Sequence, residues 1–463
     1  MSFASVPWLE LAVFVPLAGA PLVGRVRDPL AASRWCLGFA AAALACASAA
    51  WAGVAFDLAP GGAGPNDLLP LLLGARVLSL DALSAPLLPL VALLHFLTAL
   101  TTARTKMTRF SFAWLLAGCS LRLATFGCAG GWALGVLLAL NVLPPYFELR
   151  RRGRPTRVYV LHMGLFVGLL FAGLASGGTL AAVLLMAAVL VRSGTFPAHV
   201  WVTDLFENAS FGTALLFVTP IMGMYAAARL VLPTPAADWV LEGIGAASLV
   251  TAFYAAGMAL VQTDARRFFA YLFLSHASLI LVGLELHTAV SLTGALALWG
   301  SVVVSLGGFG LTLRSIEARF GRLSLAEHRG LYGQSPSLAV CFLVTGLASV
   351  GFPGTVGFVG AEMLVDGAVG ADPWVGVAVI AAAALNGIAV VRAYFLLFTG
   401  RRHASGVSLG ITRRERVAVL TLTALILAGG LFPQPGVSAS HRAAAGLLKD
   451  RAREPVPPAP AEH

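Results

Sequence analysis

Ionisable side chains gather around two places where apolar segments of this sequence are interrupted by a Phe-Pro pair. The pairs are Phe196-Pro197 and Phe352-Pro353, and Pro197 and Pro353 mark the expected helix breaks. The candidate site residues around and between the breaks are Arg192, His199, Asp204, Glu207, His276, Ser305 and Glu362. Ionisable residues beside a matched pair of interrupted membrane helices are typical of an ion or substrate path.

The elements that position these residues are expected to be membrane-spanning helices. Of the 463 residues, 58% are apolar and 11% are charged, and the mean hydropathy is +0.86, so one soluble core cannot accommodate the chain. We therefore expect an all-α membrane protein with about fourteen transmembrane helices. The apolar runs begin near Leu9, Trp35, Ala82, Phe110, Trp132, Val158, Leu180, Gly212, Trp239, Phe268, Ala289, Leu338, Val375 and Val417.

The chain is expected to form one membrane domain over residues 1–435, with its core between about residues 110 and 400. The first apolar stretch has no positive residue before it, so we interpret it as a retained helix rather than a cleaved signal peptide. Residues 436–463 are polar and end in the Pro-rich segment EPVPPAPAEH. We expect these residues to form a flexible C-terminal tail.

Charge predicts the orientation in the membrane. Arg and Lys gather in nearly every second loop, at residues 25–34, 104–109, 150–157, 266–267, 314–329 and 401–416. Such loops face the cytoplasm in bacterial-type inner membranes, so an even number of helices places both termini on the outer side. The net charge of +10 is then mostly topology and does not indicate a nucleic-acid partner.

The sequence offers little for a cofactor. The five cysteines lie in or beside apolar segments without C-x-x-C spacing, which argues against an iron-sulfur cluster or a zinc site. No Gly-rich phosphate loop, dinucleotide fingerprint or paired nucleophile and base stands out. We expect no cofactor in this chain, so any redox chemistry belongs to another polypeptide.

Three stretches carry a resemblance to a known family. Residues 192–207, RSGTFPAHVWVTDLFE, are similar to the Lys-Ser-x-x-Phe-Pro-x-His-x-Trp-Leu-x-Asp-Ala-Met-Glu signature of the proton-translocating antiporter-like subunits of respiratory complex I and Mrp antiporters. Residues 264–271, DARRFFAY, followed by Ser275-His276, resemble a loop and helix start of that family. Residues 330–364 resemble chain M of bacterial NADH-quinone oxidoreductase more than other members.

This resemblance implies a fold with two inverted five-helix repeats, each containing one broken helix. It implies a membrane subunit that translocates protons, with Na⁺ as an alternative ion, inside a larger complex. The expected partners are other membrane subunits and the lipid bilayer. As an enzyme the chain would be at most a non-redox subunit of a proton-translocating NADH-quinone oxidoreductase.

The sequence departs from the family at most of the positions that carry protons. Its two lysines are Lys106, in a loop, and Lys449, in the tail. Arg192 stands where the family has the lysine of its seventh helix, and a guanidinium does not release its proton. The fifth-helix Glu has no counterpart, since Asn141 is the nearest polar residue, and Ala361 occupies the ionisable position of the twelfth helix. The Lys and Glu relay is therefore degenerate.

The remaining polar residues each have two interpretations. Glu362 is either the outlet proton site or an acid that pairs with a partner subunit, and His276 is either a proton carrier or a neutral ring bonded inside the bundle. For Arg192 we favour a structural ion pair with Asp204 or Glu207, because a permanent charge in lipid needs a partner.

Three functions stay open on this basis. The first is a proton-translocating subunit driven by redox or ion energy elsewhere, with half-channels around His276 and Glu362. The second is a structural subunit that keeps the fold and docks its neighbours without conducting. A free-standing cation/proton antiporter ranks last, because Na⁺ exchange needs carboxylates at mid-depth and Glu362 alone is well placed.

Overall fold

The computed structural model describes residues 6–58, 67–74, 76–128, 130–234, 238–286, 288–400 and 411–452. In these ranges the chain is helical, and its β pairing is limited to two isolated bridges. The α-helices are α1 (Trp8–Arg25), α2 (Pro29–Ala55), α3 (Leu68–Leu73), α4 (Leu87–Leu100), α5 (Phe112–Phe126), α6 (Gly131–Leu140), α7 (Leu143–Arg151), α8 (Arg157–Ala175), α9 (Gly178–Ser193), α10 (Val200–Asn208), α11 (Phe211–Val218), α12 (Met222–Ala226), α13 (Trp239–Val261), α14 (Ala265–Glu285), α15 (Ala289–Phe320), α16 (Pro336–Ser349), α17 (Phe358–Ala371), α18 (Pro373–Phe398), α19 (Arg413–Leu431) and α20 (Gln434–Ala452). Short 3₁₀ segments η3 (Arg104–Arg109) and η5 (Leu331–Gly333) and a π-helical turn η4 (Ala227–Val231) complete them.

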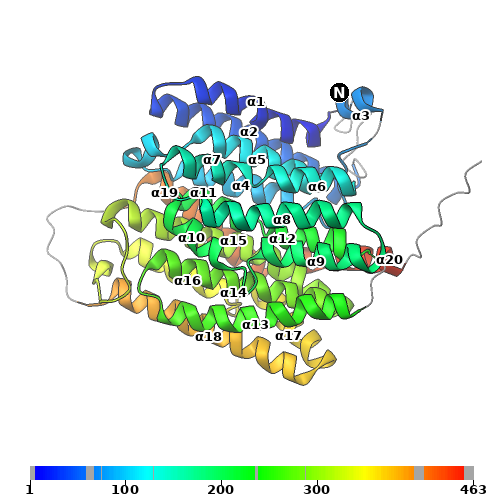
Figure 1. Ribbon diagram of the computed structural model, residues 1–463. Coiled ribbons are helices and arrows are strands. Elements are labelled where there is room, and N and C mark those ends of the chain that lie inside the picture. The colour runs from blue at the N-terminus through cyan, green and yellow to red at the C-terminus, as the bar shows by residue number, and fades with distance from the viewer. Residues whose placement is uncertain are drawn as a thin grey trace, which may run out of the picture.

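The long helices lie side by side as one bundle, with α1 and α2 along one edge and α17 and α18 along the opposite edge (Figure 1). In the part of the chain that the structure describes, nine helical segments are long and apolar enough to cross a membrane, or ten if the bent pair α19 and α20 is one span. Four further apolar helices, α4, α5, α9 and α16, are shorter. An all-α multi-pass membrane fold is confirmed, whereas the expected number of about fourteen spans is not reached by single helices.

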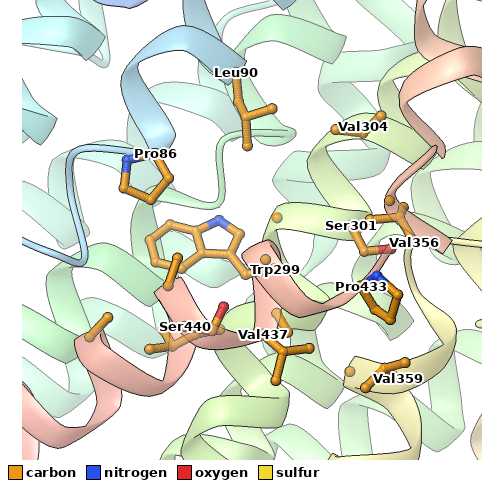
Figure 2. Close-up of a pocket in the computed structure, with 18 of the residues that line it drawn as sticks. Pro86, Leu90, Trp299, Ser301, Val304, Val356, Val359, Pro433, Val437 and Ser440 are labelled. Atoms are coloured by element: carbon orange, nitrogen blue, oxygen red, sulfur yellow. The ribbon is translucent and has the colours of Figure 1, made fainter. Parts of the chain in front are cut away.

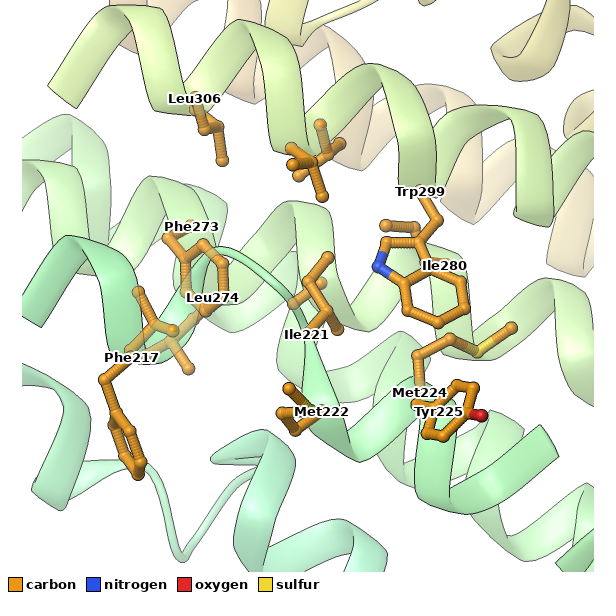
Figure 3. Packing of buried hydrophobic residues seen from close by; sticks show 14 of the residues in the cluster. Phe217, Ile221, Met222, Met224, Tyr225, Phe273, Leu274, Ile280, Trp299 and Leu306 are labelled. Atoms are coloured by element: carbon orange, nitrogen blue, oxygen red, sulfur yellow. The ribbon is translucent and has the colours of Figure 1, made fainter. Parts of the chain in front are cut away.

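Burial separates central from peripheral helices. In the most apolar part of each span, 94% of the residues are buried for α11 to η4, 89% for α14 and 78% for α15. The corresponding share is 28% for α2 and for α8. Aromatic and aliphatic side chains of the central helices interlock, including Phe217, Tyr225 and Trp299 (Figure 3). The outer helices therefore present their apolar faces to lipid, and the central ones are the place for polar groups that need protection from lipid.

Both Phe-Pro pairs lie at helix breaks, as predicted. Helix α9 ends at Ser193, where Gly194 takes a positive φ of 72°, and α10 starts at Val200 beyond Pro197. Helix α16 ends at Ser349 and α17 starts at Phe358 beyond Pro353. Pro lacks the N–H that continues a helix and clashes with the preceding turn, which explains both interruptions.

A third interruption was not anticipated. Helix α11 ends at Val218, and the chain passes through Thr219 and Pro220 before α12 begins. Ile221 adopts a φ of +49°, a conformation unfavourable for a β-branched residue, and is held there by complete burial (Figure 3). The sequence TPIM contains this signal, because Pro220 cannot donate the hydrogen bond of a continuous helix.

The prediction of a flexible C-terminal tail is wrong for most of its residues. Residues 434–452 form α20, which packs against α15 and buries Ala443, Ala444 and Leu447. Arg451 near its end pairs with Asp238, with 2.6 Å between Nη2 and Oδ1. Small residues spaced for one helical face gave this segment a surface to bury, which its overall polarity concealed. Residues 453–463 lie outside the described residues.

Helices α15 and α17 approach so closely that glycine is required between them. A Cβ atom on Gly294 would lie 2.6 Å from the backbone nitrogen of Leu364, and one on Gly360 would lie 2.8 Å from that of Leu298. Small residues permit such close packing where van der Waals contact, rather than water exclusion, holds helices together. The second broken helix is thus fixed against the long central helix.

Candidate functional site

Arg192 ends α9 in the interior of the bundle, with 3% of its surface exposed. Its Nη2 donates to the carbonyl oxygen of Phe217 at 3.3 Å, and its guanidinium lies 4.2 Å from the centre of the Phe217 ring and 5.6 Å from that of Trp201. Aromatic faces and a carbonyl dipole therefore surround this charge.

The favoured ion pair of Arg192 with Asp204 or Glu207 is not formed. Asp204 accepts a hydrogen bond from Asn208 on its own helix, and Glu207 pairs with Arg267 at 3.0 Å. The break after α9 is the reason, because α10 leaves it in a direction that brings Glu207 to the Arg-rich start of α14 instead of the end of α9.

A second buried arginine was missed. Arg122 lies in the middle of α5 with 3% exposure, and its Nη1 lies 3.3 Å from Nε2 of His95 on α4. Nδ1 of His95 is 2.8 Å from the carbonyl oxygen of Val91, so Nδ1 carries the proton and Nε2 accepts from Arg122. His95 is therefore fixed as a neutral acceptor. An arginine inside the apolar run FAWLLAGCSLRLATF was the available signal.

The two arginines share one electrostatic neighbourhood. Arg122, Arg192 and the phenol of Tyr159 lie within coulombic range of one another, and Tyr159 donates to the carbonyl oxygen of Val142 at 2.8 Å. Among the described residues, neither guanidinium has a carboxylate partner. The first half of the bundle thus holds a permanently positive interior.

Aromatic rings surround the histidine at the first break. Nε2 of His199 lies 3.3 Å from the hydroxyl of Tyr254, and the His199 ring contacts the rings of Phe196, Tyr254 and Tyr271 at centre distances of 5.7, 5.1 and 6.1 Å. Asp204 and Glu207 are half-buried further along α10. The structure therefore brings His199 together with two phenols from α13 and α14, and places Arg192 against different partners.

His276 lies on α14 beside the end of α16. The ring is 3% exposed, and its Nδ1 lies 2.7 Å from the carbonyl oxygen of Leu272 on its own helix. The backbone of Ser349, the last residue of α16, lies close enough to act electrostatically on the ring.

Serine and asparagine side chains line the same region. Asn386 on α18 donates to Ser275 at 2.8 Å, and Ser275 donates to the carbonyl oxygen of Ala252 at 2.8 Å. Ser305 bonds back to its own helix, to the carbonyl oxygen of Ser301 at 2.8 Å. Ser301 Oγ has no hydrogen-bond partner among the described residues.

A cavity of about 260 Å³ adjoins the second break. Its walls are mostly apolar and come from α4, α15, α17, α19 and α20, with Trp299, Val356 and Pro433 around it and Ser301 at its edge (Figure 2). Apolar cavities do not hold ordered water strongly. This space therefore does not form a permanent water chain to His276.

Glu362 lies away from the interior residues. It is exposed on α17, and in the described part of the chain it forms no hydrogen bond or ion pair. Asp366, one turn later, is exposed as well. The structure thus separates Glu362 from His276, with which the sequence had grouped it. Across the described residues no cluster of three or more His, Cys, Asp or Glu side chains is suited to a metal ion.

Comparison with known proteins supplies a family. The model of the transmembrane region of NADH:quinone oxidoreductase and Mrp antiporter proteins matches residues 160–386. NADH-quinone oxidoreductase subunit N of Chromohalobacter salexigens is 29% identical over 250 residues, 52% of each chain. Subunit 13 of the Thermus thermophilus enzyme is 29% identical over 418 residues, 81% of this chain and 86% of that one.

The first of these relatives is matched over about half its length. A chain of respiratory complex I from Thermus thermophilus has the same fold, with a TM-score of 0.85, 23% identity and coverage of 96% of this chain and 100% of that chain. Both Phe-Pro pairs lie within the residues that the family model matches. The chain therefore belongs to the antiporter-like membrane subunits of the NADH:quinone oxidoreductase and Mrp antiporter family.

Proposed function

We propose that this chain is a proton-translocating membrane subunit of an NADH-quinone oxidoreductase-like or Mrp-like complex, and that protons pass it at the second broken helix. The observation that carries the proposal is the position of His276, a buried imidazole that bonds to its own helix and lies beside the end of α16. Such a ring accepts and releases a proton without leaving its place. Redox chemistry or cation flow in partner subunits supplies the energy.

The arrangement of helices supports this family function. Joining α6 with α7, α9 with α10, α11 with α12 and α16 with α17 gives about fourteen spans, since each pair is then one interrupted helix. Residues 112–231 and 239–398 then each hold five spans, with the Phe-Pro break in the fourth. This equivalence is the pattern expected of two inverted repeats.

The Arg-rich end of the bundle is proposed to face the cytoplasm of a bacterial-type inner membrane. Both termini then lie on the outer side. His276 lies on α14, one of the most buried spans of the bundle, and we place it with the second break between the two membrane surfaces. The arginines of the first half hold their charge throughout, because a guanidinium keeps its proton at accessible pH.

The proposal is tested by proton flux. The chain with its co-purifying partners is reconstituted in proteoliposomes, and a trapped pH-sensitive dye reports proton entry under an imposed potential. We expect His276→Gln to lower the rate about tenfold or more, the range of a removed proton-transfer group. His95→Gln is the matched control, because a glutamine oxygen still accepts from Arg122 and His95 is fixed as neutral. Equal rates for His276→Gln and the unchanged protein would reject the proposal.

Glu362→Gln separates the two interpretations of that acid. With Glu362 on the exposed face of α17, we propose that it contacts a partner subunit. The variant is then expected to keep its proton flux and to lose part of its co-purifying partner. A loss of flux with the partner retained would instead identify Glu362 as the outlet site.

A non-conducting structural subunit is the second candidate. Two observations favour it: neither lysine of the sequence lies in one of the nine helical segments that could span a membrane by themselves, and the cavity beside the second break is mostly apolar. Proteoliposomes whose partner subunits pump, but in which the His276→Gln variant pumps equally well, would support this function.

A further inference from the structure

A small basic cavity lies at the Arg-rich end of the bundle, far along the helices from the second break. Its volume is about 110 Å³, enough for a phosphate group. Five segments form its walls: η3, the end of α7, the turn into α11, the start of α14, and the last turns of α15. The charged residues that line it are Lys106, Arg109, Arg152, Arg266, Arg314 and Glu317.

Positive charge in this cavity exceeds the carboxylates that balance it. Glu317 is fully engaged by Arg266, with two contacts of 2.7 Å, and Glu148 lies 3.6 Å from Arg152. Glu148 is in turn occupied by the backbone N–H of Ser210 at 2.8 Å. Five cations thus face two carboxylates, which leaves an excess of three positive charges.

Arg314 is the innermost of these cations and has no carboxylate of its own. It donates to the carbonyl oxygen of Thr98 and to the hydroxyl of Thr102, both at 2.8 Å, and its guanidinium lies 5.0 Å from the centre of the Phe110 ring. These contacts fix its orientation without neutralising it. The cavity therefore has a rigid, charged floor.

Lys106 and Arg109 form the outer rim. Both are exposed on η3, and within the described residues neither takes part in an ion pair. Phe110 and Phe211 line the cavity beside them and give it an apolar side. The rim lies where η3 joins the apolar helices α4 and α5, and the proposed orientation of the chain puts this end of the bundle at the cytoplasmic surface of the membrane.

We infer that this cavity binds the phosphate of an anionic phospholipid, with the phosphate between Arg314 and the rim cations and the glycerol and first acyl carbons against Phe110 and Phe211. A basic pocket between membrane helices at the cytoplasmic surface is suited to such headgroups. The inference uses the proposed orientation of the chain and is independent of whether the chain moves protons.

The test is lipid binding to the full chain, purified with its partners and stripped of lipid in detergent. Native mass spectrometry counts bound lipid during titration with phosphatidylglycerol, and with phosphatidylethanolamine of the same acyl chains. The double variant K106Q and R109Q is expected to weaken phosphatidylglycerol binding about 25-fold, since each basic side chain near the surface contributes roughly a fivefold effect. Arg104→Gln is the matched control, because Arg104 is exposed on the same short helix and does not line the cavity.

Several outcomes would overturn the inference. Equal binding of the two lipids would show that charge does not select the ligand, and unchanged binding in the double variant would place the lipid elsewhere. Displacement of phosphatidylglycerol by millimolar inorganic phosphate alone would identify free phosphate as the ligand of the cavity. Because no flux is measured, failure here is distinct from failure of the proton-translocation proposal, and thermal unfolding of each variant verifies its fold.

Discussion

Two arginines are buried in this chain without a carboxylate partner among the described residues. Arg192 is surrounded by Phe217, Trp201 and a backbone carbonyl, and Arg122 by a neutral histidine. These partners stabilise a cation through quadrupoles and dipoles, which are weaker than a carboxylate but require no second desolvated charge. Each guanidinium therefore keeps its proton and does not transfer it to a neighbour.

Gly118 provides a direct test of how firmly Arg122 is held. A Cβ on Gly118 would lie 2.5 Å from Nη1 of Arg122, so Gly118→Ala forces the guanidinium away from His95. We expect the free energy of unfolding to fall by about 1–3 kcal/mol, the usual cost of overpacking. Thermal unfolding in detergent measures this change. The control is Gly257→Ala, since no atom lies within 4 Å of its added Cβ. Equal unfolding temperatures would show that Arg122 has room to move.

Asp81 predicts a dependence of stability on pH. It lies in the turn before α4, where burial alone would raise its pKa, but Arg229 at 2.6 and 2.7 Å and hydrogen bonds within the turn outweigh burial and lower the pKa below its usual 3.8. A lowered folded-state pKa contributes stability above the unfolded value, and that stability is lost as the pH falls through the folded-state value. The unfolding temperature should therefore fall below about pH 4, and Asp81→Asn should flatten that fall. An identical acid limb in the variant would contradict this role.

Among single residues, the sequence predicted positions better than partners. Arg192 and His276 are buried at the breaks as expected of functional polar groups, whereas the partner of Arg192 was wrong because it depends on the direction in which α10 leaves the break. Arg122 was not predicted as a site residue, because it is a lone charge in an apolar run and belongs to none of the three stretches that resemble the family. Glu362 is exposed because the face that α17 turns inward is set by Gly360 and Gly367, which contact α15.

At the scale of helices, the interrupted elements are held by close contact with uninterrupted ones. Helix α15 contacts α14, α16, α17, α19 and α20, and the break between α16 and α17 lies against it. The Phe-Pro pairs made both breaks predictable, since Pro removes a helix hydrogen bond. The position of α20 was not predictable from periodicity alone, because its small residues bury little area and its polar residues suggest a tail.

Gly360→Ala tests the contact between α15 and α17. The added Cβ would lie 2.8 Å from the Leu298 backbone nitrogen, which cannot rotate away, so the helices must separate. We expect the free energy of unfolding to fall by about 1–3 kcal/mol. We also expect faster proteolysis in the loop between α16 and α17. Gly370→Ala on the same helix meets no atom within 4 Å and should be neutral or slightly stabilising. If the Gly360→Ala variant resists proteolysis as well as the unchanged chain does, this contact does not fix α17.

At the scale of the whole molecule, composition established the membrane class and the alternation of basic loops predicted an orientation. The number of spans was harder to obtain, because the apolar helices α4, α5, α9 and α16 are each shorter than a full membrane span, and α9 and α16 end at the Phe-Pro breaks. Hydropathy registers the apolar run and is insensitive to a bend within it. The burial ranking of helices also required the fold, since central and peripheral spans have similar composition.

The orientation is tested by labelling from one side. In a variant without the native cysteines, Thr105→Cys places a thiol on η3 and Ala289→Cys places one at the start of α15, both at exposed positions. A membrane-impermeant maleimide added to intact spheroplasts is expected to label Ala289→Cys and to leave Thr105→Cys unlabelled until the cells are lysed. The reverse pattern would invert the topology.

The carboxylate-free pair of buried arginines has a consequence for leakage. A fixed positive potential in low-dielectric surroundings repels every cation that enters, as a pore arginine excludes protons from a water channel. We therefore expect the half of the bundle that contains Arg122 and Arg192 to oppose the passage of cations, protons included, even where water enters between its helices.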